Sequence, residues 1–70
     1  MSEHVYKHLQ LTGSSRTSVE DAVAKAIARA NETVRNINWF RITETRGHVV
    51  DGKVDHWQVT IDVGFRLEDE

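Results

Sequence analysis

Hydrophobic and polar residues alternate most regularly in two stretches, residues 38–50 (NWFRITETRGHVV) and 53–67 (KVDHWQVTIDVGFRL). This period of two predicts a pair of β-strands. The dipeptide Asp51-Gly52 between them predicts a two-residue type I′ hairpin turn, because that turn needs positive φ at both positions, which Asp tolerates and Gly adopts freely. Counting outward from the turn, we expect Val50 to face Lys53, Thr45 to face Gln58, Ile42 to face Ile61, Phe40 to face Val63 and Trp39 to face Gly64.

The same register divides the hairpin into an apolar face and a polar face. The apolar face, which is the predicted core, carries Phe40, Ile42, Trp57, Val59, Ile61, Val63, Phe65 and Leu67. The polar face carries Trp39, Arg41, Thr43, Thr45, His56, Gln58, Thr60 and Asp62. A tryptophan therefore begins the polar face, opposite a glycine that has no side chain to cover it, and this makes Trp39 the first candidate for function.

Residues 19–34 follow the helical period instead, with apolar side chains at Val19, Ala22, Val23, Ala26, Ile27, Ala30 and Val34. This spacing places them on one stripe of an amphipathic α-helix. Residues 17–20 (TSVE) fit a capping box, so we expect the helix to begin with Thr17 as its N-cap. Asn36 and Asn38 tolerate a left-handed helix end, and we expect the helix to stop near residues 35–38.

Residues 4–12 (HVYKHLQLT) predict a first strand, with Tyr6, His8 and Gln10 on its polar face. We expect the short run Gly13-Ser14-Ser15 to end this strand as a loop. The element order is then strand, helix, strand, strand, in a single domain over residues 1–70. If all neighbouring strands are antiparallel, the third strand lies between the other two. This gives an α+β fold, a three-stranded antiparallel sheet of order 1-3-2 (topology βαββ) wrapped around one amphipathic helix.

Composition narrows the classes of function. The formal net charge is -2 and the sequence pI is near 6.0, and the scattered Lys and Arg residues argue against nucleic-acid binding. No apolar run has the length of a membrane span, and the first residues (MSEHVYKH) lack the apolar segment of a signal peptide, so we expect a cytoplasmic protein. A chain of 70 residues without cysteine has a small core and no disulfide. Oligomerisation is the expected supplement.

Trp39, Gln58 and two arginines each allow a structural and a binding interpretation. Trp39 either covers a helix end or stacks on a planar ligand. Gln58 is either solvated or matches the edge of a heterocycle that alternates carbonyl and N–H groups. Arg46 and Arg66 either form surface ion pairs with neighbouring glutamates or hold the phosphate of a nucleotide. The residues alone leave these alternatives open.

The histidines do not predict a metal centre, and no residues predict hydrolysis. His4 and His8 are four positions apart on a strand, roughly 13 Å from each other and too far to share an ion. His48 and His56 fall on opposite faces in the counted register. We therefore expect no metal site within one subunit, and no nucleophile lies in a spacing that predicts a catalytic triad.

The runs TGSSRTSVEDAVAKAIARA, NWF, RGHVVDGKV and HWQVTIDVGFRLED together resemble the dodecins, small flavin-binding proteins that assemble as hollow shells of twelve subunits. The similarity covers nearly the whole chain. It implies a homododecamer in which two flavins lie between two Trp39 residues across a two-fold axis. It also implies that Gln58 hydrogen-bonds the ring edge and that Arg46 and Arg66 contact the phosphate of FMN. Thr45, expected opposite Gln58, is included among the cofactor-binding residues.

The chain departs from the family at Trp57, where dodecins more often have phenylalanine, and its place on the predicted core face suggests an effect on packing. Our hypothesis is a non-catalytic protein that stores and sequesters flavin and protects it from light, with FMN favoured over riboflavin or FAD. One alternative is a carrier of coenzyme A or another nucleotide. The other is a flavin reductase, for which the sequence shows no nicotinamide site.

Overall fold

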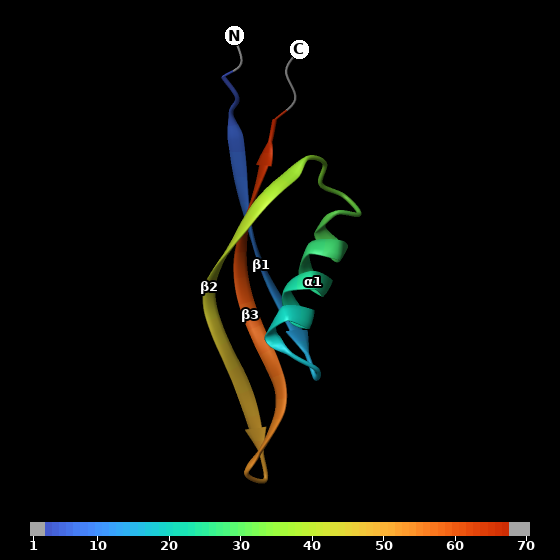
Figure 1. Cartoon of the computed structure of the whole chain (residues 1–70), viewed down its shortest axis with the longest axis vertical. Helices are drawn as coiled ribbons and strands as arrows, with labels where there is room; N and C mark the ends of the chain where they lie inside the picture. Colours follow the sequence, from blue (N-terminus) through green and yellow to red (C-terminus); the bar gives the residue numbers. More distant parts are fainter. Residues whose placement is uncertain (1–2, 68–70) are drawn as a thin grey trace.

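The computed structural model describes residues 3–67. They form strand β1 (Tyr6–Ser15), helix α1 (Val19–Ala30), strand β2 (Ile37–Val50) and strand β3 (Lys53–Arg66). The strands make one antiparallel sheet in the order β1-β3-β2, which confirms the predicted βαββ topology and strand order. Helix α1 lies against one face of this sheet, and the β2–β3 hairpin continues past it to a tip without helical cover (Figure 1). We call the face toward α1 the inner face and the opposite one the outer face.

The β2–β3 hairpin turns where predicted, with φ angles of 53° at Asp51 and 77° at Gly52. The predicted pairs hold at both ends of the hairpin, from Val50 with Lys53 to Trp39 with Gly64. Between these ends the register shifts twice, between His48 and Val49 and between Ile42 and Glu44. Each shift is a β-bulge that adds one residue to one strand. The first extra residue lies on β3 and the second on β2, so the two displacements cancel.

Two predictions made for the middle of the hairpin are wrong because of these bulges. Thr45 pairs with Val59 rather than with Gln58, and directly paired residues share a face of the sheet. Thr45 therefore lies on the inner side, with the buried Val59. His48 pairs with His56, and their rings stack with centroids 4.6 Å apart, so these histidines share one face rather than lying on opposite faces.

Strand β1 is longer at its C-terminal end than the sequence predicted. Gly13, Ser14 and Ser15, which we expected to form a loop, pair with β3 as regular strand residues. A Cβ atom at Gly13 would lie 2.6 Å from the backbone oxygen of Ala22 and 2.9 Å from Cβ of Ala26. Gly13 is therefore a packing residue, because the missing side chain lets α1 lie close against the strand.

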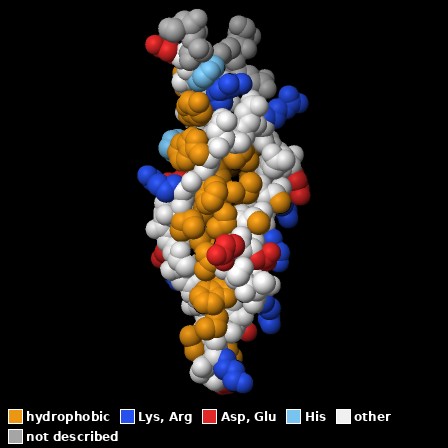
Figure 2. All heavy atoms as spheres, in the orientation of Figure 1, with side chains coloured by type: hydrophobic (Ala, Val, Ile, Leu, Met, Phe, Trp, Pro, Cys, Tyr) orange, Lys and Arg blue, Asp and Glu red, His pale blue; other side chains and the backbone are white. Residues whose placement is uncertain are grey.

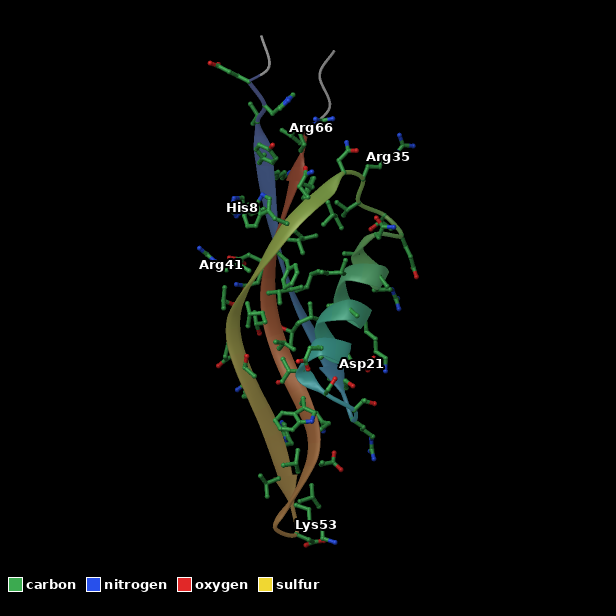
Figure 3. The ribbon with its side chains drawn as sticks, viewed as in Figure 1. His8, Asp21, Arg35, Arg41, Lys53 and Arg66 are labelled. Atoms are coloured by element: carbon green, nitrogen blue, oxygen red, sulfur yellow. The ribbon has the colours of Figure 1, made fainter. Side chains whose placement is uncertain are left out.

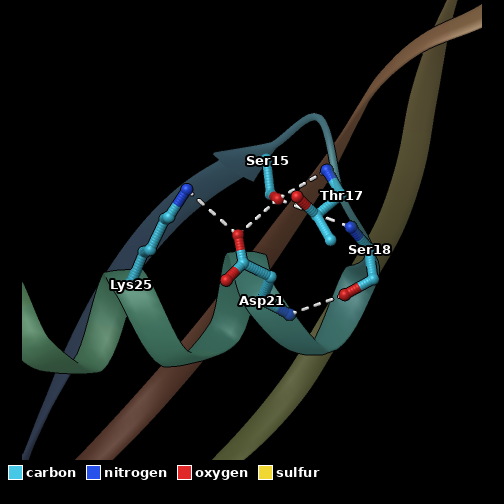
Figure 4. Close-up of polar contacts among 5 residues, drawn as sticks. All are labelled: Ser15, Thr17, Ser18, Asp21 and Lys25. Carbon is cyan, nitrogen blue, oxygen red and sulfur yellow. Dashed lines mark hydrogen bonds and ion pairs between the residues drawn. The ribbon is translucent and has the colours of Figure 1, made fainter.

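The boundaries of α1 also differ from the prediction. Ser18, not Thr17, is the N-cap, and its hydroxyl accepts a hydrogen bond of 3.0 Å from the backbone N–H of Asp21 (Figure 4). The helix ends at Ala30 rather than near residues 35–38. The residues that follow Ala30 are Asn, Glu and Thr, of which Asn and Thr are weak helix formers. Asn36 does adopt a left-handed φ of 63°, but it does so just before β2.

The core lies between α1 and the central strand β3. Its buried apolar side chains are Ala22, Val23, Ala26, Ala30, Val59, Ile61 and Val63. Phe40 and Ile42 of the predicted core face remain 46% and 42% exposed, because α1 packs on β1 and β3 and leaves β2 largely uncovered. Hydrophobic side chains consequently form a long band on the surface of this elongated subunit (Figure 2).

Candidate functional site on the outer face of the sheet

Trp39 lies on the outer face, directly over Gly64 of the central strand. A Cβ atom at Gly64 would overlap Cε2 and Cζ2 of the indole and lie 2.5 Å from its Nε1. The indole thus occupies the space that any other residue at position 64 would fill. Trp39 nevertheless remains 38% exposed, so part of this large aromatic surface is left for a contact outside the subunit.

His8 completes the row of residues that crosses the sheet at this point. Gly64 pairs with His8 of β1 on one side and with Trp39 of β2 on the other. The imidazole and indole ring centroids are 5.0 Å apart, and the ring planes meet at 82°, an edge-to-face contact. The indole therefore spans the central strand and meets a residue of the first strand.

The next row of the outer face is a charged network. Arg41 contacts Asp62 through Nη2 and Oδ2 at 3.1 Å, and Gln10 donates a hydrogen bond of 3.3 Å from Nε2 to the other carboxylate oxygen. The Asp62 side chain is 17% exposed, whereas that of Arg41 is 68% exposed. Asp62 is thus held from both sides, while the Arg41 guanidinium keeps most of its surface in water beside Trp39.

Gln58 lies on the outer face but far from Trp39 of the same subunit. Arg46, rather than Thr45, is its cross-strand partner, and Nε of Arg46 donates a hydrogen bond of 3.2 Å to Oε1 of Gln58. Gln58 and Gly64, which lies under the indole, are six positions apart on β3, which corresponds to about 20 Å. One subunit therefore does not bring Trp39 and Gln58 together around a single small ring.

The other predicted site residues lie at different places: Arg66 and Arg46 near opposite ends of the outer face, and Thr45 on the inner face. Arg66 pairs with Tyr6 next to the Trp39 row and lies near the adjoining ends of β1 and β3 (Figure 3). Arg46 lies at the Gln58 end, where its Nε is also 3.8 Å from Oε1 of Glu44. Thr45 is on the inner side with Val59. Within one subunit, the two arginines thus lie at separate places on the outer face.

The stacked His48 and His56 rings lie beyond Gln58, towards the hairpin tip. Nδ1 of His56 is 2.7 Å from Oδ2 of Asp55, and this hydrogen bond holds the pKa of the Asp55 carboxyl below its ordinary value. Arg16 adds a weaker contact, with Nη1 at 4.0 Å from the second carboxylate oxygen. This cluster has its own internal partners, so we do not place it in the candidate site.

Within residues 3–67, no group of three or more His, Cys, Asp or Glu side chains converges on a point where an ion could bind. No helix in that part of the chain is long and apolar enough to cross a membrane.

Sequence reasoning placed His8, Gln10 and Arg41 on polar faces but gave them no role beside Trp39. The register between β2 and β3 follows from the hairpin turn, so the pair Trp39 and Gly64 could be counted. The register between β1 and β3 could not be counted, because a helix and a further strand separate them in the chain. The neighbours that β1 contributes therefore appear only in the structure.

These features define a class of protein: a small α+β subunit with one helix on the inner face of its sheet and an exposed aromatic platform on the outer face. The comparisons give the family. A family model described as Dodecin matches residues 5–68, and the chain belongs to the dodecin family.

Individual relatives agree with this assignment. The dodecin of Thermus thermophilus is 43% identical over 65 residues, which cover 93% of this chain and 94% of that protein. A calcium dodecin of Mycobacterium tuberculosis is 35% identical, over 90% of this chain and 89% of that protein. The solved structure of dodecin from Streptomyces coelicolor is 44% identical, covers 100% of both chains and superposes with a TM-score of 0.91. The similarity thus extends over the whole subunit.

Proposed function

We propose that this protein binds flavin, with FMN favoured, and that the isoalloxazine ring stacks on the indole of Trp39. The observation that carries the proposal is the indole lying over Gly64 with 38% of Trp39 exposed on the outer face. A planar heterocycle can bury this aromatic surface, and such a stack contributes about 1–3 kcal/mol by analogy with nucleic-acid bases. The residues present fit the ring, because the exposed part of the indole that covers Gly64 offers a flat aromatic surface for stacking.

The proposed site is formed by more than one subunit. If Gln58 hydrogen-bonds the ring that stacks on Trp39, the separation of about 20 Å along β3 requires Gln58 from a neighbouring copy. A two-fold axis would supply it, since the same patch of each subunit then faces the other. The two Trp39 residues of such a pair would enclose two flavins, as the family resemblance implies.

Exposed apolar surface supports assembly into the homododecamer implied by that resemblance. Val5 and Val49 are 65% and 69% exposed, and Phe40 and Ile42 line an apolar groove with Val23 of α1. The hydrophobic band of Figure 2 extends over much of the described chain, and contiguous exposed apolar surface of this kind marks interaction sites. Light scattering tests this point, because a stable monomer of 8.0 kDa would contradict it.

The proposed role is storage, sequestration and photoprotection rather than catalysis. Bound flavin supplies light absorption and redox chemistry, and Trp39 at stacking distance can give an electron to the excited ring and take it back, so that both end unchanged. Burying both faces of the ring, one against an indole and the other against the second flavin, also keeps oxygen and substrates away from it. A flavin reductase would need an open ring face for hydride transfer. Steady-state oxidation of NADH by the FMN-loaded protein distinguishes the two roles.

Coenzyme A or another nucleotide remains the competing ligand. The polar hollow lined by Arg16 and Lys25 offers cations, but Lys25 is 3.0 Å from Asp21 and Arg16 is 4.0 Å from Asp55. These paired charges give no specific support for a phosphate there, so flavin is preferred. Identification of the ligand released from the purified protein, together with its absorption spectrum, decides between flavin and coenzyme A.

The Trp39→Ala variant tests the site itself. We expect it to lose most flavin affinity, about 1–3 kcal/mol, and to restore the fluorescence of added flavin. Trp57→Phe is the matched control, because Trp57 shares the inner face with Val59 and pairs with Gly47. Loss of quenching in Trp57→Phe with intact quenching in Trp39→Ala would contradict the proposed site.

A further inference from the structure

His8 stands beside the indole on which the proposed flavin site depends. It belongs to β1, on the other side of Gly64 from Trp39, and its ring meets the indole at 82° with a centroid separation of 5.0 Å. His8 and Arg41 project from the side of the sheet that faces away from α1 (Figure 3). The residue is exposed, so its imidazole can exchange protons with water.

Charged and titratable neighbours surround this contact on all three strands. Arg41 on β2 and Asp62 on β3 form an ion pair of 3.1 Å, which largely neutralises both. Arg66 on β3 lies opposite Tyr6 in the strand register, and Tyr6 and His8 share a face of β1.

A second histidine, His4, precedes β1 and is four positions from His8 in the chain. Helix α1 lies on the opposite face of the sheet (Figure 1). Of the residues on the Trp39 row, His8 is the one whose type changes charge between pH 5 and 8.

We propose that His8 is a positioning residue that couples Trp39, and through it the flavin site, to pH. The effect of His8 on bound flavin rests on the proposed flavin function. The contact between His8 and Trp39 concerns the protein alone. The neutral imidazole packs against the indole and holds it over Gly64. The protonated imidazole places a full positive charge next to the same ring.

The charge matters because quenching requires the indole to part with an electron. A positive charge in contact with the ring opposes that loss, because it repels the positive charge that develops on the indole. One electron leaves the indole for the excited flavin and the same electron returns, so no external oxidant or reductant is needed. Protonation of His8 therefore slows the quenching of bound flavin, although the residues and the ligand of the site stay the same.

The first test uses the protein without flavin. In a Trp57→Phe background, the emission of Trp39 is titrated from about pH 8 to about pH 5, the range over which a histidine gains its charge. We expect a loss of emission on acidification, because a protonated imidazole in contact with an excited indole accepts an electron more readily. His8→Gln in the same background should remove this pH dependence, while His48→Gln should keep it. Identical profiles for His8→Gln and its parent would overturn the proposal.

The second test measures the fluorescence lifetime of bound riboflavin, whose uncharged tail removes the titration of a phosphate. We expect the lifetime to lengthen on acidification in the parent protein and to stay constant in His8→Gln. A constant lifetime in the parent would overturn the coupling to the site. If no flavin binds at all, the proposed function fails, but the titration of Trp39 emission still decides whether His8 and the indole are coupled.

Discussion

Each face of the sheet has a glycine beside which another group occupies the place of a side chain. That group is the backbone of α1 on the inner face and the indole of Trp39 on the outer face. On the inner face, a Cβ atom at Gly13 would lie 2.6 Å from the backbone oxygen of Ala22. On the outer face, a Cβ atom at Gly64 would overlap the ring of Trp39. A helix backbone cannot move without repacking the core, whereas an exposed indole can rotate away. We therefore regard Gly13 as a residue of the fold and Gly64 as a residue of the site.

Gly13→Ala should give the largest loss of stability. Because its methyl group would overlap the backbone of α1, the helix must shift away from β1 and the core repacks, at a cost of about 1–3 kcal/mol. Denaturant unfolding of the flavin-free protein measures this loss. Ser14→Ala, at the next and exposed position of β1, is the control and should stay within about 0.5 kcal/mol of the parent. Equal stability of the two variants would remove the distinction between the faces.

Gly64→Ala should affect flavin affinity more than stability. Its methyl group displaces the Trp39 indole rather than a backbone, so the unfolding free energy should fall less than in Gly13→Ala. Flavin affinity should fall by up to about 1–3 kcal/mol, the value of a lost aromatic stack. Fluorescence titration with riboflavin measures it. An unchanged affinity combined with a large loss of stability would mean that Gly64 also serves the fold.

The same comparison shows what a sequence can reveal about this molecule. The turn at Asp51-Gly52 is a local property of two residues, so the hairpin, its end pairs and the position of Trp39 over Gly64 could be predicted. The two bulges, at Asp55 on β3 and at Thr43 on β2, could not, because each adds one residue to opposite strands and the two displacements cancel in the alternation pattern.

Tertiary context also decided the ends of the elements. Gly13-Ser14-Ser15 has the composition of a loop, yet the long partner β3 continues alongside and extends β1 through it. Val34 continues the helical period in the sequence, but the helix ends at Ala30. The pairing of Trp39 with Gly64 lies within one hairpin and could be predicted from the sequence, whereas the contact of His8 with Trp39 depends on a strand pairing that no local pattern encodes.

The outer face can be divided further into residues for the ring and residues for the phosphate. Gln58→Ala should weaken riboflavin and FMN equally, by roughly 1–3 kcal/mol, because the lost hydrogen bonds are to the ring. Arg66→Ala should weaken FMN towards riboflavin and leave riboflavin unchanged, because a charge-assisted contact to the phosphate is lost. Titration of both flavins into both variants measures the two effects.

Arg46→Ala is less selective than Arg66→Ala in this experiment. Arg46 donates a hydrogen bond of 3.2 Å to Gln58, so its removal also releases the glutamine side chain. We expect Arg46→Ala to weaken FMN more than riboflavin but to affect both. Equal losses of the two flavins in Arg66→Ala would contradict the preference for FMN.

The smallest effect is expected on the inner side, where a polar network fixes the start of α1 (Figure 4). The Ser15 hydroxyl donates a hydrogen bond of 2.6 Å to Oδ2 of Asp21 and accepts one of 2.9 Å from the backbone N–H of Thr17. Lys25 lies 3.0 Å from the same carboxylate oxygen. The hydrogen bond from Ser15, followed by that from Lys25, holds the pKa of Asp21 below its ordinary value.

This lowered pKa fixes the direction of a pH effect on stability. A carboxyl group with a lower pKa in the folded state stabilises the fold above its unfolded pKa of about 3.9, and the contribution is lost as the pH falls through the folded value. Asp21→Asn should therefore be less stable than the parent at pH 7, and the difference should shrink below about pH 4. Asp55 titrates in the same acid range but is present in both proteins, so the difference between their denaturation curves isolates Asp21. A difference that stays constant from pH 7 into the acid range would show that Asp21 acts through packing rather than through its charge.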